Sequence, residues 1–143
     1  MKNISKKEIK AVLKAAKKAR KKAYAPYSKY RVGAAVLDSD GNIWQGCNVE
    51  NISFSETLHA EEVAITNAIV NGKKGAKFKA IAVVTKNKKN NKNPWPCSHC
   101  RQVLCEFGLE LIVITENKKG KVKTKLLKEL IPYPFCPQKY KKI

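Results

Sequence analysis

The sequence predicts a three-layer α/β/α fold around a mixed, mostly parallel five-stranded sheet. Helical and strand-like segments alternate along the chain, and a hairpin signal joins the first two strands. Two later apolar runs are β-branched and lack alternation, which is typical of strands buried on both faces. The 143 residues suit one domain over 1–143, and we expect its ends, 1–4 and 138–143, to be flexible.

The first helix is expected over residues 5–22. Its apolar residues at helical spacing are Ile9, Val12, Leu13 and Ala16. Ser5 and Glu8 have the spacing of a capping box, which satisfies backbone N–H groups at a helix start. Pro26 follows in a turn-like segment that ends the helix.

A β-hairpin is expected next. The short apolar run 32–37 and the segment 43–47 flank Asp40-Gly41, a dipeptide that favours a tight turn between antiparallel strands. A loop over 48–56 then leads to the second helix.

Two helix–strand units follow the hairpin. Helix 57–70 carries apolar residues at helical spacing, stops at Gly72, and precedes a strand at 80–85. Helix 97–107 begins after two prolines and precedes a strand at 111–115. Helical crossovers of this kind join parallel neighbours, which is why a mostly parallel sheet is expected.

The C-terminal part is expected to add two short elements. Val122 is assigned to a short edge strand, and residues 124–130 to a last short helix. The tail contains three prolines, so it cannot be regular helix.

The strongest pattern in the sequence lies on the second and third predicted helices. His59 and Glu61 are separated by one residue, and Cys97 and Cys100, which follow Pro96, are separated by two. Together they match the H-x-E … P-C-x-x-C signature of zinc nucleobase deaminases. Two cysteines at a helix start can point both sulfurs at one ion, and the helix amides stabilise thiolates.

The predicted ligand set is that of a catalytic zinc site. His59, Cys97 and Cys100 supply three ligands and leave the fourth tetrahedral position open for water, so one Zn²⁺ per subunit is expected. Two thiolates and one neutral imidazole leave the centre without net charge, so it needs no arginine where Glu62 stands. His99 lies between the cysteines and is expected to be structural rather than a ligand.

Glu61 is the expected catalytic residue. It lies two residues from a ligand, so it can reach the activated water without binding the metal. Zinc lowers the pKa of such a water toward roughly 7, and Glu61 would carry protons from the water to ring N3 and to the departing amine.

On these residues the chain resembles the small cytidine deaminases, from about Glu8 to Pro137. The segments that carry the resemblance are 25–30, 32–35, 46–51, 59–61, 96–102 and 130–135. The resemblance implies zinc-dependent hydrolysis of cytidine and 2′-deoxycytidine to uridine and 2′-deoxyuridine, with release of ammonia, in pyrimidine salvage. Arg101-Gln102 is typical of the members that act on nucleosides.

The resemblance also implies substrate contacts. Asn48 and Glu50 correspond to the pair that hydrogen-bonds the ribose 3′-hydroxyl, and the backbone amide of Ala60 to the donor for the pyrimidine 2-carbonyl. Tyr30 corresponds to an aromatic residue beside the base, and Phe135 to one that reaches a neighbouring subunit's site. The chain length resembles that of homotetrameric members, so a homotetramer with sites at subunit interfaces is expected.

Three features depart from the short members of the family. Those usually have cysteine and arginine where His59 and Glu62 stand here. Phe54 replaces a tyrosine common in them, which affects a contact to the ribose 5′ end. Tyr133-Pro134 replaces a small pair in the C-terminal tail.

The charge is strongly positive: 30 Lys and Arg stand against 11 Asp and Glu, a net charge of +19. Such a surface can attract nucleic acid or anionic lipid. The lysines are spread over several segments, however, which favours a general positive field, and no nucleic-acid partner is expected.

No apolar run approaches the roughly 18 residues of a membrane span and no secretory signal is recognisable, so a cytoplasmic protein is expected.

Three alternatives stay open. A deaminase of cytosine or adenine in RNA, or of a nucleoside antibiotic, shares the zinc pattern, but the Asn48 and Glu50 pair argues against both. A basic RNA-binding module with structural zinc is the third alternative. An open coordination position with Glu61 beside it argues against that reading.

Overall fold

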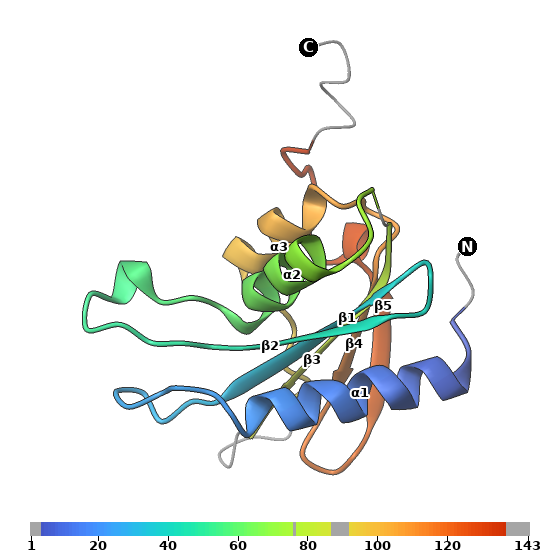
Figure 1. Cartoon of the computed structure of the whole chain (residues 1–143). Coiled ribbons are helices and arrows are strands. Elements are labelled where there is room, and N and C mark those ends of the chain that lie inside the picture. The colour runs from blue at the N-terminus through green and yellow to red at the C-terminus, as the bar shows by residue number, and fades with distance from the viewer. Residues whose placement is uncertain (1–3, 76, 87–91, 137–143) are drawn as a thin grey trace.

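The computed structural model describes residues 4–75, 77–86 and 92–136 (Figure 1). The ends 1–4 and 138–143 are expected to be flexible. Apart from Ile4, these residues lie outside the described ones. The helices and strands are, in chain order, α1 (Lys6–Arg20), β1 (Val32–Asp38), β2 (Ile43–Cys47), α2 (Ala60–Asn71), β3 (Phe78–Thr85), α3 (Ser98–Cys105), β4 (Ile112–Glu116) and β5 (Val122–Leu126), with short 3-10 turns at Phe54–Glu56 and Leu127–Glu129.

The five strands form one sheet in the order β2-β1-β3-β4-β5. The pairs β1/β2, β1/β3 and β4/β5 are antiparallel, and β3/β4 is parallel. The expected mixed five-stranded sheet is therefore confirmed, but the expectation that it is mostly parallel is wrong. Because β1 lies between β2 and β3, the crossover through α2 returns β3 beside a strand that runs the opposite way. The chain then adds β5 to β4 as a second hairpin.

Helices cover both faces of the sheet (Figure 1). α1 packs on one face, over an apolar cluster that includes Val12 and Ile114. α2 and α3 pack on the other face, over a cluster that includes Ala64 and Leu104. The three-layer α/β/α architecture is confirmed, and its two cores are separated by the sheet.

Two glycines let the helices approach the sheet closely. A Cβ atom on Gly33 would lie 2.1 Å from the carbonyl oxygen of Ala16 in α1, and one on Gly46 would lie 2.2 Å from the backbone nitrogen of Ala64 in α2. No side chain fits at such distances, because protein interiors are already close-packed. Gly46 therefore sets how near the first turns of α2 lie to β2.

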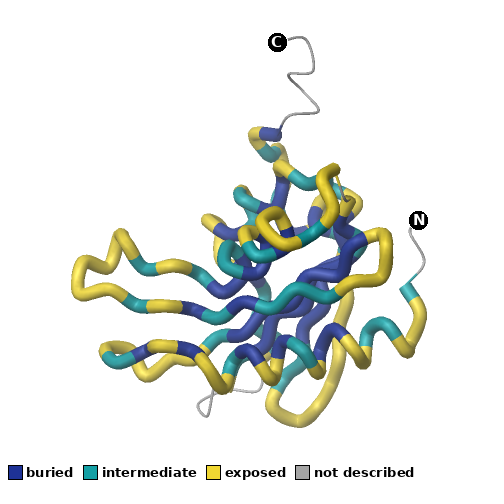
Figure 2. The backbone as a smooth tube through the Cα atoms, in the orientation of Figure 1, coloured by how far each residue is buried: buried dark blue, intermediate teal, exposed yellow. Residues whose placement is uncertain are grey.

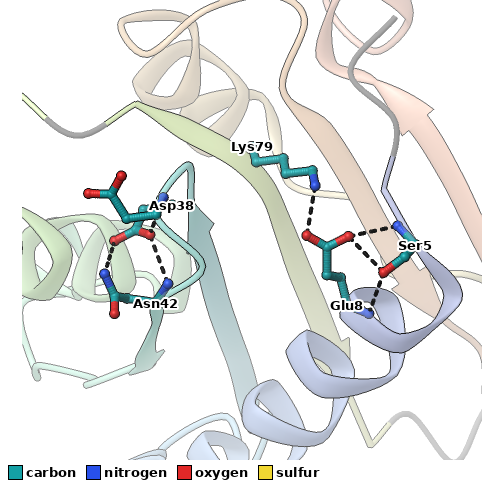
Figure 3. A network of polar contacts seen from close by, with 6 residues as sticks. Ser5, Glu8, Asp38, Asn42 and Lys79 are labelled. Carbon is teal, nitrogen blue, oxygen red and sulfur yellow. Dashed lines mark hydrogen bonds and ion pairs between the residues drawn. The ribbon is translucent and has the colours of Figure 1, made fainter.

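The start of α1 is capped as the sequence predicts. The Ser5 hydroxyl accepts a hydrogen bond from the Glu8 backbone N–H at 3.2 Å, and the Glu8 carboxylate accepts one from the Ser5 N–H at 2.7 Å (Figure 3). Lys79 of β3 also donates to Glu8 at 2.7 Å. The hydrogen bond from Lys79, and then those from Ser5, lower the pKa of Glu8 to about 2. One carboxylate thus caps α1 and ties it to the sheet.

Asp38 holds the β1–β2 hairpin from inside. It is 1% exposed, and its carboxylate accepts hydrogen bonds from the Asn42 backbone N–H at 2.8 Å and from the Asn42 side chain at 3.0 Å (Figure 3). The Trp44 side chain also donates a hydrogen bond to it at 3.0 Å. Burial acts to raise the pKa of Asp38, but the hydrogen bonds from Trp44 and Asn42 outweigh it, so the pKa is lowered. The predicted hairpin is confirmed, with a buried carboxylate at its turn.

The prediction of a C-terminal helix over 124–130 is wrong. Residues Val122–Leu126 form β5, which pairs with β4 in a register that includes Ile114 with Thr124, and only Leu127–Glu129 makes a single 3-10 turn. Pairing with β4 satisfies the backbone groups of this segment, so tertiary structure overrides its local helical pattern. The edge strand expected at Val122 is confirmed.

Two long loops extend beyond one end of the sheet, before β1 and after β2 (Figure 2). They are largely exposed and carry several apolar side chains. None of the helices in the described ranges has the length and apolar character that a membrane crossing requires.

Candidate metal centre

The starts of two helices carry the metal-binding side chains. His59 is the N-cap residue of α2 and Cys97 that of α3, while Cys100 lies in the first turn of α3. The His59 Nδ1 atom lies 3.4 Å from the Cys97 Sγ atom and 3.3 Å from the Cys100 Sγ atom. All three ligand atoms lie within 4.8 Å of one another. The structure thus brings the three predicted ligands together.

This donor set fits a zinc ion. A tetrahedral site with Zn–N near about 2.0 Å and Zn–S near about 2.3 Å places nitrogen and sulfur ligands about 3.5 Å apart. The observed separations of 3.3 and 3.4 Å are close to that value. Burial raises the pKa of the Cys100 thiol, so a neighbouring cation is needed to keep it as a thiolate.

Glu61 lies beside this cluster in the first turn of α2. The residue is only 5% exposed, yet it lines a pocket that opens to solvent. Burial is the main influence on its carboxyl group and raises its pKa. A buried carboxyl at a pocket wall can exchange protons with a molecule bound in that pocket.

Glu62 joins the starts of the two helices that carry the ligands. One carboxylate oxygen accepts a hydrogen bond from the His59 backbone N–H at 2.9 Å, and the other lies 2.8 Å from the His99 Nε2 atom in α3. The rings of His59 and His99 pack with their centroids 5.1 Å apart. Burial acts to raise the pKa of Glu62, but the contacts with His99 and His59 outweigh it and lower the pKa. His99 therefore contacts Glu62 and stands outside the ligand cluster.

A pocket of about 330 Å³ adjoins the cluster. The predicted site residues that line it are Tyr30, Asn48, Glu50, His59, Ala60, Glu61 and Cys97. Cys100 lies behind the pocket wall and is fully buried. Ala60 is the first residue of α2, a position whose backbone N–H has no acceptor within the helix and can bind a ligand. The volume suits a small molecule.

Asn48 and Glu50 are fixed in place by the loop before β1 and by the first residue of that strand. The Asn48 side chain accepts a hydrogen bond from the Val32 N–H at 2.8 Å and donates one to the Tyr30 carbonyl at 2.9 Å. Glu50 accepts hydrogen bonds from the backbone N–H of Ser28 at 3.2 Å and from its hydroxyl group. The Ser28 hydroxyl is the main cause of the lowered pKa of Glu50. Both side chains keep polar capacity for a ligand.

Phe135 does not line the pocket of its own chain. Its residue is 71% exposed, and its carbonyl oxygen accepts a hydrogen bond from Gln102 of α3. The expectation that Phe135 reaches another subunit's site stays a prediction.

Several pocket residues were missed by reasoning from sequence. Val83 and Thr85 at the end of β3, Thr57 before α2 and Trp95 before Cys97 all line the pocket. Trp95 carried a signal, because a large aromatic residue stands two positions before a ligand. The others carried none, since only the fold brings them to the site.

Arg101 supports the segment that leads into α3. Its guanidinium group donates hydrogen bonds to the Pro96 carbonyl and to the Leu130 carbonyl, both at 2.7 Å. The contact fixes the backbone directly before Cys97. In this chain the arginine of the Arg101-Gln102 pair therefore supports the metal centre from outside the pocket.

Comparison with known proteins agrees with this geometry. Residues 6–116 match the family described as the cytidine and deoxycytidylate deaminase zinc-binding region. This chain belongs to that family. Family membership and the His-Cys-Cys cluster together make it a zinc-dependent hydrolytic deaminase.

Individual relatives of this deaminase match over nearly the whole chain. The cytidine deaminase of Sporosarcina psychrophila is 40% identical over 133 residues, which cover 92% of this chain and 93% of that protein. The cytidine deaminase of Halalkalibacterium halodurans is 38% identical over 129 residues, 89% of this chain and 93% of that protein. The crystal structure of cytidine deaminase from Burkholderia pseudomallei superposes with a TM-score of 0.81 at 42% identity, covering 88% of this chain and 98% of that one.

Proposed function

We propose that this deaminase hydrolyses cytidine and 2′-deoxycytidine to uridine and 2′-deoxyuridine and releases ammonia. The observation that carries the proposal is a single pocket of about 330 Å³ lined by two of the metal-binding residues, His59 and Cys97, by Glu61, and by the fixed side chains of Asn48 and Glu50. The metal ligands and the side chains proposed to bind the sugar thus line one cavity, whose volume suits a nucleoside. The curated relatives, which are cytidine deaminases, support the same substrate class.

The reaction divides between the metal and one carboxylate. His59, Cys97 and Cys100 would hold one zinc ion per subunit, a Lewis acid that would lower the pKa of a water to roughly 7. Glu61 accepts a proton from the water that adds to C4 and delivers it to ring N3. Glu61 then takes the proton of the hydroxyl group added at C4 and passes it to the 4-amino group, which leaves as ammonia while the 4-carbonyl forms.

The remaining pocket residues orient the nucleoside. Asn48 and Glu50 hydrogen-bond the ribose 3′-hydroxyl, a group that both nucleosides possess. The Ala60 backbone N–H donates to the pyrimidine 2-carbonyl, and Tyr30 packs beside the base. These roles predict that a nucleoside without a 3′-hydroxyl group binds weakly.

The decisive experiment follows the ultraviolet absorbance of cytidine during incubation with the purified protein. We expect turnover that a zinc chelator abolishes and added Zn²⁺ restores. The same assay compares 2′-deoxycytidine with cytosine in a single-stranded RNA oligonucleotide. Turnover of the oligonucleotide without turnover of free nucleosides would overturn the proposal in favour of an RNA deaminase.

We also propose that the enzyme is a homotetramer whose sites lie at subunit interfaces. Exposed apolar residues gather on the two long loops next to the pocket, where Tyr27 and Phe54 pack edge to face with centroids 6.2 Å apart. Exposed apolar patches of this kind mark contact surfaces. Light scattering on the eluting protein would measure the mass, and a monomer would contradict the proposal. We further propose that the enzyme acts in the cytoplasm in pyrimidine salvage. Growth of cells that depend on this enzyme, with cytidine as their pyrimidine source, would test that role.

A mixing experiment tests whether Phe135 acts across an interface. Glu61→Gln removes the catalytic carboxylate, and Phe135→Ala removes the exposed aromatic side chain. Co-expression of the two inactive variants should restore activity, because a subunit that keeps Glu61 then receives Phe135 from a neighbour. Absence of restoration in a confirmed mixed oligomer would place Phe135 outside the neighbouring site.

A further inference from the structure

The basic residues divide unequally between the two helical layers. The Lys and Arg residues of α1 are Lys6, Lys7, Lys10, Lys14, Lys17, Lys18 and Arg20, and its single acid is Glu8. That acid is occupied, because Lys79 and Ser5 bind it. α2 and α3 together carry one such base, Arg101, and two acids. A merely lysine-rich composition would load both layers, so the placement on α1 needs its own explanation.

The lysines of α1 border a groove of about 850 Å³. The lysines that line it are Lys6, Lys10, Lys14, Lys17, Lys18 and Lys21. Its apolar lining comes from Ile9 and Leu13 of α1 and from Val122 of β5. The acid among the lining residues, Glu116, is already paired with Lys17. The groove therefore combines an apolar floor with a rim of net positive charge, on which six lysines stand against one acid.

The groove continues toward the deaminase pocket. Lys17 and Glu116 also line a second hollow of about 280 Å³, together with Arg20, Lys86 and Lys118. Thr85 belongs to that hollow and to the pocket next to the metal centre. Arg20 lies at this junction and donates a hydrogen bond to the Thr85 carbonyl at 3.0 Å. Basic side chains thus follow one path from the outer face of α1 to the edge of the site.

We propose that this basic groove binds single-stranded nucleic acid, a function separate from the hydrolysis of free nucleosides. The 15 residues of α1 extend about 22 Å, which is long enough to contact several nucleotides of a single strand. Lysine ammonium groups on the rim neutralise phosphates, while the apolar floor accepts sugars and base faces that a duplex keeps stacked inside. Six of the lysines line this groove, because helical spacing places them along one side of α1 and its C-terminal end.

The test uses the full-length protein and a fluorescein-labelled 20-nucleotide single-stranded RNA, with binding followed by fluorescence anisotropy. Lys10→Glu with Lys14→Glu reverses two exposed charges on the rim of the groove. The matched control, Lys73→Glu with Lys74→Glu, reverses two exposed charges after α2. Both double variants change the net charge equally and leave the residues of the pocket at the metal centre intact. Cytidine turnover and the melting temperature therefore verify that each variant is folded.

We expect the groove double to weaken RNA binding at least about tenfold and to reduce the slope of log affinity against log salt by about two, while the control changes affinity less than about twofold. Equal losses in both doubles would show a general field and overturn the proposal. Equal affinity for the duplex form of the same RNA would also overturn it. So would binding to vesicles rich in anionic lipid in the absence of RNA binding.

Discussion

The two helical layers of this enzyme use their helix starts for different purposes. α1 begins with Ser5 and Glu8, which cap the helix and bind the sheet through Lys79. α2 and α3 begin with His59 and Cys97, whose side chains lie in the metal-binding cluster, and at α2 the Glu62 carboxylate accepts a hydrogen bond from the His59 N–H. A side-chain cap contributes about 1 kcal/mol, so α3 gives up local stability by placing a ligand at its N-cap position. The chemistry lies where the local rules of helix formation are broken.

The largest effect should come from Glu61, the buried carboxylate of the second layer. Glu61→Gln should reduce kcat/KM for cytidine at least about a thousandfold, because the proton carrier is lost while the ligands stay. Zinc content, measured by atomic absorption, should be unchanged. Glu106→Gln, an exposed change just after α3, is the control and should keep normal turnover. Normal turnover by Glu61→Gln would remove Glu61 from the proposed mechanism.

Substitutions at Gly33 and Gly46, the two glycines that lie against helix backbone, allow a direct comparison of the two layers. Gly46→Ala and Gly33→Ala should each lower the free energy of unfolding by about 2 kcal/mol in urea titrations, because the new Cβ atom collides with helix backbone. Gly46→Ala should also lower the activity of the folded enzyme, since α2 carries Ala60 and Glu61. Gly33→Ala displaces α1 and should keep most of that activity. Equal losses of activity would show that the two layers are not independent.

Glu62 should affect the metal more than the fold. Glu62→Ala removes the hydrogen bonds to the His59 backbone and to His99, so we expect zinc affinity to fall about tenfold in competition with a chromophoric chelator. His99→Ala removes one of these contacts and should cause a smaller loss. Unchanged affinity in both variants would mean that the contact between the helices does not position the ligands.

The smallest effect concerns Glu8 in the first layer. Its folded-state pKa of about 2 lies below the ordinary value of 4.5, so its stabilising contribution is complete above about pH 4.5 and is lost as the pH falls through 2. Glu8→Gln should lower the melting temperature by at most about 3 °C at pH 7, because the group is partly exposed to solvent, which screens its charge. Melting curves from pH 7 to pH 2 should converge for the two proteins. A difference that persists at pH 2 would contradict this origin.

Local patterns predicted the elements whose causes are local. The capping box at Ser5 needs residues three positions apart, and the hairpin around Asp40-Gly41 depends on one turn, so both are found where expected. The strand at Ile43–Cys47 has the predicted bounds. The helix predicted over 124–130 is wrong because this segment pairs with β4, a separate strand, and no local pattern reports that pairing. The same limit explains the sheet, since the position of β1 between β2 and β3 decides which neighbours are antiparallel.

The sequence by itself determined the chemistry of this protein: the zinc cofactor and the deaminase family follow from residue types at fixed spacing, because ligand preference and helix starts are local properties. Only the tertiary structure decided what lies around that chemistry. The contact of Glu62 with His99, the pocket wall at Trp95 and Thr85, and the position of Glu116 and Val122 beside the lysines of α1 depend on distances between elements far apart in the chain. Those distances are set by packing across the sheet, which residue spacing does not encode.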